Sequence, residues 1–276
     1  MMKTIGLMAL AAAGLVTVTG SMETPVVGDL FEATPGVQQT QDWDWQGSVD
    51  RGDAIEIKGI NGGIKATGSS GGQVTVTAVK KGKDDDPADV RIEVVEHSGG
   101  VTICAVYPDV KGKKNECAPG DGGRLSSQDN DVSVTFTVQV PAGVRLVATT
   151  VNGGIEAGGI GADVSATTVN GDVKVSTSGL ARATTVNGSI QASMGRGDWD
   201  GALHFNTVNG SITVNLPDGV STDVSASTVN GGMETDFPLT VKGRFSMKNM
   251  HGTIGNGGRE LEMATVNGSI HLKSGG

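Results

Sequence analysis

Apolar and polar residues alternate with a period of two on both sides of a recurrent Asn-Gly pair. In the copy at Asn152, apolar side chains stand six and four residues before the Asn, at Leu146 and Ala148, and three residues after it, at Ile155. The neighbouring position after the turn is polar, at Glu156. This alternation is typical of strands with one buried face. Each copy is therefore predicted to be a strand, a tight turn and a second strand.

The turn contains the motif Thr-Val-Asn-Gly in six complete copies, with two degenerate copies in addition. From Asn152 onward, successive members of the Asn column lie 16 to 22 residues apart, about 19 on average. The column consists of Asn61, Asn152, Asn170, Asn187, Asn209, Asn230, His251 and Asn267, with His251 in a degenerate copy. Such a period indicates a repeat architecture.

A unit of this length buries too little apolar surface to fold alone, so the units must stack and hydrogen-bond to one another. We expect an all-β, single-chain β-solenoid (β-helix-like) with two or three faces and an irregular N-terminal β section. With strands ~4.8 Å apart, the steps from Asn152 to Asn267 would span ~29 Å if the coils follow the order of the sequence.

Stacking would bring identical side chains of the motif above one another. Asn tolerates left-handed backbone angles and Gly adopts them freely, so the pair suits a sharp corner. We expect the Asn amides to hydrogen-bond up the column as a ladder. The Thr hydroxyls two positions earlier are expected to form a second ladder.

The chain begins with a segment typical of a secretory signal. Lys3 precedes an uncharged apolar run from Ile5 to Val18, and small residues follow up to Gly20. The run is shorter than the ~20 residues of a transmembrane helix. We expect a signal peptide over residues 1–20, a linker and capping segment over 21–50, and a β-strand-repeat domain over 51–276 with regular repeats over 146–272.

The two cysteines fit an exported protein. Cys104 and Cys117 flank a charged loop and lie 13 positions apart. Export favours a disulfide between them. A metal pair is disfavoured because no His or further Cys stands close by in the sequence, and thiol catalysis is disfavoured more strongly.

The residues also resemble a known family. Gly52-Asp53-Ala54-Ile55-Glu56-Ile57, followed by Asn-Gly-Gly-Ile, is similar to the opening of the bacterial "putative adhesin" β-strand-repeat family, a domain of unknown function. The segment from Val140 to Leu146, which leads into the tandem Thr-Val-Asn-Gly units, is similar as well. The resemblance covers residues 51–272 and brings no catalytic residues with it.

Charge and composition exclude some functions. The chain of 276 residues has 21 Lys and Arg against 30 Asp and Glu, a net charge of −9, so a nucleic acid would be repelled. A polysaccharide lyase or hydrolase needs carboxylates that converge on one face, but the outward column after the turn is mixed. It reads Glu156, Lys174, Gln191, Thr213 and Glu234. We therefore identify no catalytic, cofactor-binding or metal-binding residues and predict that the protein is not an enzyme.

These observations predict a non-catalytic exported protein of the periplasm, the cell surface or the medium. The leading interpretation is an adhesin or cell-envelope scaffold that presents a binding surface to an envelope or cell-surface protein or polysaccharide. The alternative is a periplasmic ligand-binding or envelope-stress-sensing accessory module. Open solenoid ends also invite self-association, for which the last coil, Ile270 to Lys273, is the candidate.

Overall fold

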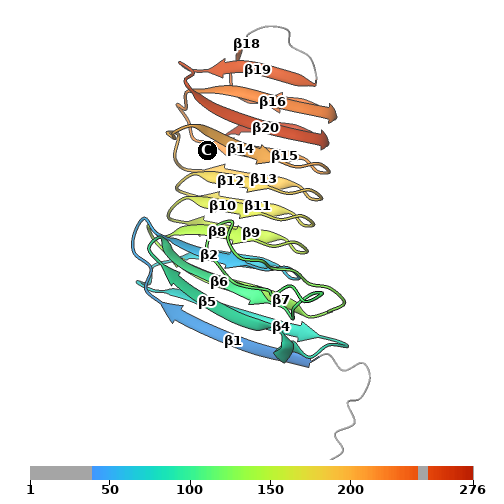
Figure 1. The fold of residues 1–276 in the computed structure, drawn as a ribbon. Coiled ribbons are helices and arrows are strands. Elements are labelled where there is room, and N and C mark those ends of the chain that lie inside the picture. The colour runs from blue at the N-terminus through green and yellow to red at the C-terminus, as the bar shows by residue number, and fades with distance from the viewer. Residues whose placement is uncertain (1–38, 242–247, 276) are drawn as a thin grey trace, which may run out of the picture. The chain divides into compact units, whose positions relative to one another are not determined.

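The computed structural model describes residues 39–241 and 248–275, which fold into two β-sheets lying face to face (Figure 1). The expected signal peptide and the part of the linker before residue 39 lie outside these residues. The described part contains one short 3₁₀ helix, η1 (Pro87–Asp89), and no α-helix. No helix in it is therefore long and apolar enough to cross a bilayer.

Each coil crosses from one sheet to the other at the Asn-Gly corner. The strand before the corner belongs to sheet B and the strand after it to sheet A. In spatial order, sheet A consists of β1 (Gln39–Gly47), β4 (Val74–Gly82), β7 (Ser133–Pro141), β3 (Ile64–Ser69), β9 (Ile155–Ile160), β11 (Val173–Thr177), β13 (Ile190–Met194), β15 (Ile212–Leu216), β21 (Ile270–Ser274) and β17 (Met233–Thr235).

Sheet B has the same spatial progression, with extra strands at both ends. It consists of β5 (Arg91–His97), β6 (Gly100–Val106), β2 (Ala54–Lys58), β8 (Arg145–Thr149), β10 (Val164–Thr167), β12 (Ala181–Thr184), β14 (Ala202–Asn206), β20 (Arg259–Asn267), β16 (Thr222–Asn230), β19 (Asn249–Ile254) and β18 (Thr240–Val241). The predicted fold class, an all-β solenoid, is confirmed.

The core is a thin layer of side chains in register between the sheets. In sheet A, Val173 lies between Ile155 and Ile190, and all three are buried. In sheet B, Val164 lies between Leu146 and Ala181. Because parallel pairing repeats these contacts in every coil, small aliphatic side chains fill the space and few aromatic side chains are needed.

The N-terminal end of the body is built from antiparallel strands. β1 pairs with β4, β4 with β7, and β5 with β6. Trp43 and Trp45 of β1 are half-buried and pack against the core. The loop after β6 covers the outer face of sheet B, where the Lys58 ammonium donates hydrogen bonds to the carbonyl oxygens of Ala118 and Gly120.

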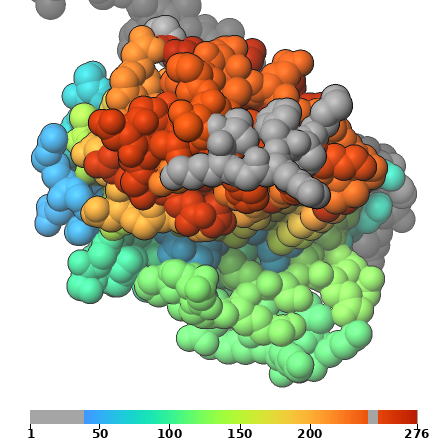
Figure 2. All heavy atoms as spheres, turned by 90° about the horizontal axis from the view of Figure 1, so that it is seen from above, coloured from blue at the N-terminus to red at the C-terminus, as the bar shows by residue number. Residues whose placement is uncertain are grey.

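At the C-terminal end the coils do not follow the order of the sequence. The last coil, β20–β21, lies between the coil β14–β15 and the coil β16–β17. The expectation that residues 270–273 form an exposed end is therefore wrong, since β21 has a neighbour on each side. Figure 2 looks onto this end, where the atoms of the described residues are coloured orange and red. The physical reason is that all coils have equivalent edges, so sequence order alone does not select neighbours.

The sequence pattern places His251 in the Asn column, and this expectation is wrong. His251 lies in β19, which runs antiparallel to β16 and places His251 opposite Ser225. An antiparallel strand cannot continue a column of parallel corners, because its turn points the other way. The chain then returns through residues 255–258 to form the inserted coil.

Candidate binding surface

The asparagines of the motif form a continuous side-chain ladder. In spatial order it runs through Asn61, Asn152, Asn170, Asn187, Asn209, Asn267 and Asn230. Each Nδ2 donates to Oδ1 of the preceding member over 2.8 to 2.9 Å. Each step uses one donor and one acceptor, so interior amides retain a second N–H that the ladder does not use.

The threonines of the motif do not form a hydroxyl ladder. Each is buried, and its Oγ1 donates to the carbonyl oxygen of the Gly in the neighbouring coil, as from Thr168 to Gly153 over 2.8 Å. The same bond recurs from Thr207 to Gly188.

Glycine is required at the corner by close packing. A Cβ at Gly171 would lie 2.2 Å from the carbonyl oxygen of Gly153, and one at Gly188 would lie 2.0 Å from that of Gly171. None of the ladder asparagines has a positive φ. The expectation that the Asn adopts a left-handed backbone is therefore wrong. The ladder hydrogen bonds of its side chain are what the Asn contributes at this position.

The valines of the motif form an exposed row that the alternation of apolar and polar residues does not predict. The exposed fraction of their side chains is 37 to 53%, and no other large apolar side chain among the described residues is as exposed. The six are Val151, Val169, Val186, Val208, Val266 and Val229. They point outward because the preceding Thr points inward. The signal was present in the sequence, since Val is invariant at this position of the six complete motifs.

We name these six valines and the adjacent asparagines, one pair in each complete coil, the Val-Asn strip. It has almost no charge. From three positions before the Asn to two positions after it, Asp172 is the one charged residue in the six coils. Charged residues make up 18% of the whole chain. One edge of an acidic protein is therefore nearly uncharged and carries a row of methyl groups.

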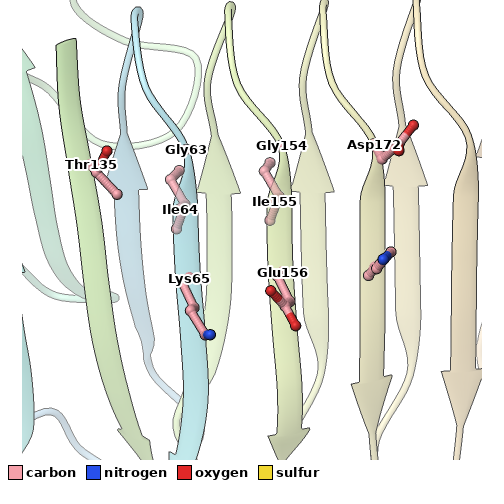
Figure 3. A pocket seen from close by; sticks show the side chains of 9 residues that line it. Gly63, Ile64, Lys65, Thr135, Gly154, Ile155, Glu156 and Asp172 are labelled. Carbon is pink, nitrogen blue, oxygen red and sulfur yellow. The ribbon is translucent and has the colours of Figure 1, made fainter.

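The outer face of sheet A has two adjoining shallow depressions, each with a volume of about 280 Å³. The first lies over β7, β3, β9 and β11 and is lined by Lys65, Thr135, Glu156, Asp172 and Lys174 among others (Figure 3). The second continues from Lys174 through Ser176 and Gln191 to Asn215. Asn215 Nδ2 donates to Ser193 Oγ there, over 2.8 Å. Hydroxyls, amides and charges of both signs thus line one elongated surface.

The Cys104–Cys117 disulfide and Asp131 hold loops in place. Cys104 and Cys117 are joined in a disulfide. Asp131 accepts backbone hydrogen bonds from Asp84, Lys83 and Asp85, and that from Asp84 contributes most to holding its pKa below the usual value. Over residues 39–241 and 248–275, no cluster of three or more His, Cys, Asp or Glu side chains has the arrangement of a metal site.

Tyr107 is the one tyrosine of the chain. It is buried, and its hydroxyl donates to the carbonyl oxygen of Val132 over 2.8 Å. Burial raises the pKa of Tyr107 to about 12. A phenol held by a backbone carbonyl deep under a loop is a structural group rather than a reactive one.

A family model for the "Toastrack DUF4097" domain matches residues 53–273, which include the whole ladder and both depressions. The chain belongs to the Toastrack DUF4097 family. Among curated proteins, none matches the chain. The Toastrack match identifies a fold and a family of unknown function, and it assigns no residue a role.

Solved structures similar to this Toastrack chain share little sequence with it. A "putative cell adhesion protein" from Clostridium sporogenes ATCC 15579 is 11% identical with a TM-score of 0.47, over 86% of this chain and 100% of that one. A "putative adhesin" from Bacteroides fragilis NCTC 9343 is 17% identical with a TM-score of 0.34, over 87% and 98%. A "putative lipid binding protein" from Parabacteroides distasonis ATCC 8503 is 11% identical with a TM-score of 0.27, over 86% and 97%.

Proposed function

We propose that this protein is a non-catalytic, exported β-solenoid that acts as an adhesin or cell-envelope scaffold. The observation that carries the proposal is the elongated polar surface on the outer face of sheet A. It extends across consecutive coils from Lys65 to Asn215. The disulfide between Cys104 and Cys117 supports export, because such bonds persist in oxidising compartments.

The ligand that we propose for this surface is a polysaccharide of a cell envelope or cell surface. Small-molecule sites are concave and enclose most of their ligand, whereas these depressions are shallow and adjoin one another along the sheet. Ser176, Gln191 and Asn215 supply hydroxyl and amide groups on neighbouring strands. A polymer with many hydroxyl groups can hydrogen-bond to such a row, and each coil adds a further polar contact.

The experiment compares two double variants that make the same kind of change on opposite sheets. Lys174 and Ser176 point outward from β11 in sheet A, and Arg182 and Thr184 point outward from β12 in sheet B. In each case one cation and one hydroxyl are replaced by Ile, which suits strands. Retention of the purified chain is measured on peptidoglycan, insoluble polysaccharides and whole cells.

We expect the wild-type chain and R182I/T184I to be retained, and K174I/S176I to be released. Equal retention of both variants would place binding away from sheet A. Retention on cells that is abolished by protease treatment of those cells would identify a protein ligand instead. Absence of retention on every surface, together with a purely periplasmic location, would favour the sensing module over the adhesin.

A further inference from the structure

The Val-Asn strip is more apolar than the fold requires. The Thr of each motif fills the space inside the corner and is buried, while the Val side chain points outward and is 37 to 53% exposed. A polar β-branched residue would suit the same backbone position. Single exposed apolar residues are normal, but a contiguous apolar patch marks an interaction site. Here every exposed large apolar side chain of the described residues belongs to one row.

The backbone of the strip is unavailable to an added strand. At Asn187, for example, the backbone N–H donates to the carbonyl oxygen of Val169 over 2.7 Å. Its carbonyl oxygen accepts from Gly171 over 2.9 Å. A partner must therefore pack against side chains, the valine methyls and the second N–H of each ladder amide.

The spacing of the strip constrains that partner. The six valines stand at the corners of successive coils, whose strands are ~4.8 Å apart, so the row extends over ~24 Å. The ladder bonds hold this spacing on every coil. A surface that places a methyl group opposite each valine must have the same period, which is the period of another stack of β-strands. A second copy of this chain has the same period because it is built from the same coils.

Charge favours the same partner. The chain has a net charge of −9, so two copies repel each other over most of their surfaces. The strip and its flanking positions hold Asp172 alone among charged residues. Two copies can approach closely at this edge without bringing many carboxylates together.

We propose that two copies of this protein associate edge to edge through the Val-Asn strip. The contact is isologous, with the same valines contributed by both copies. It leaves the second depression on the outer face of sheet A free in both copies, so a dimer would hold two polymer-binding surfaces and gain avidity. The self-association concerns the side of the solenoid, not its ends, and it does not depend on the proposed ligand.

The test is the mass of the purified chain in solution over a concentration series, measured by sedimentation. Val186 and Val208 lie on adjacent coils near the middle of the row, and V186D/V208D places two carboxylates there. S176D/Q191D adds the same charge on the exposed face of sheet A and serves as the control. Both variants are first checked for the wild-type unfolding transition.

We expect a concentration-dependent dimer for the wild-type chain and for S176D/Q191D. V186D/V208D should weaken the dimer by about tenfold or more, because paired carboxylates would be desolvated in the contact. A wild-type chain that stays monomeric at millimolar concentration would overturn the proposal. So would a dimer that both variants weaken equally.

Cysteine cross-linking tests the contact without added charge. Because Cys104 and Cys117 are joined, a cysteine introduced at the strip is the free thiol of the chain. Oxidised V186C alone should form a covalent dimer if equivalent coils face each other. A mixture of V186C and V208C should do so if the two rows run in opposite directions. S176C should remain monomeric, and an absence of cross-links in every strip variant contradicts the proposal.

Retention of V186D/V208D on glycans is measured separately, so loss of the dimer and loss of the ligand surface are distinguished.

Discussion

Asn267 donates its side-chain amide to Oδ1 of Asn209 over 2.8 Å, although 58 residues separate the two in the sequence. The copy that follows Asn209 in the sequence, Asn230, lies one step further out and bonds to Asn267. The last coil is thus inserted between two earlier ones. It connects β16–β17 to the rest of the solenoid.

The inserted coil should control the stability of its outer neighbour. Leu261 is fully buried in β20, so Leu261→Ala should lower the free energy of unfolding by about 2–5 kcal/mol. Hydrogen exchange should accelerate in β16 as well as in β20, because β16 pairs with the body through β20. The control is Leu146→Ala in β8, which is equally buried but lies in the middle of the stack. Unchanged protection of β16 in Leu261→Ala would contradict the expected coupling.

The ladder should contribute measurably to stability despite its exposure. Asn187→Ala removes the bond that Asn187 donates to Asn170 and the bond that it accepts from Asn209. We expect a loss of about 1–2 kcal/mol in the free energy of unfolding, measured with urea. Asn230 is the outermost member, with one ladder bond, so Asn230→Ala should cost about half as much. Equal costs for both variants would argue against the ladder as the cause.

Asp131 should stabilise the folded chain at neutral pH and lose this effect in strong acid. Its pKa in the folded chain is below the ordinary 3.8, chiefly because the backbone N–H of Asp84 donates to it. The stabilisation is complete above the unfolded-state pKa and is lost as the pH falls through the folded-state pKa. Asp131→Asn should therefore be less stable than the wild-type chain at neutral pH, with a difference that shrinks below pH ~4. Urea unfolding across the acid range measures it, and a pH-independent difference would exclude this origin.

Tyr107 gives the opposite pH dependence at the alkaline end. Its folded-state pKa is about 12 against an ordinary 10.0, because burial disfavours the phenolate. Its stabilising effect is present below pH 10 and is lost as the pH rises toward 12. As Tyr107 is the one tyrosine, ultraviolet absorbance reports its ionisation directly. Titration near pH 10 in the folded chain would contradict the buried position. Unfolding in urea should restore that ordinary value and serves as the control.

The pairing of the inserted coil illustrates what sequence patterns leave undecided. His204 and Glu262 meet across β14 and β20 with 2.8 Å between Nδ1 and Oε2. On the other sheet, His271 Nδ1 lies 3.1 Å from Glu234 Oε2. If β16 followed β14 directly, the register would place Ser225 opposite His204. These long-range pairs favour the observed order, but nothing in a repeat of period ~19 distinguishes them beforehand.

The sequence by itself determined the elements, the corners and the solenoid architecture. Alternation of period two and the Asn-Gly pair act within a single coil, and stacking follows because one coil cannot bury enough surface alone. Tertiary structure decided which coil lies beside which, and it placed His251 in an antiparallel strand rather than in the column. It also decided that Val186 and its equivalents stand exposed beside the ladder while Thr185 lies buried. Identical motifs carry identical local preferences, so only contacts between distant segments can rank their arrangements.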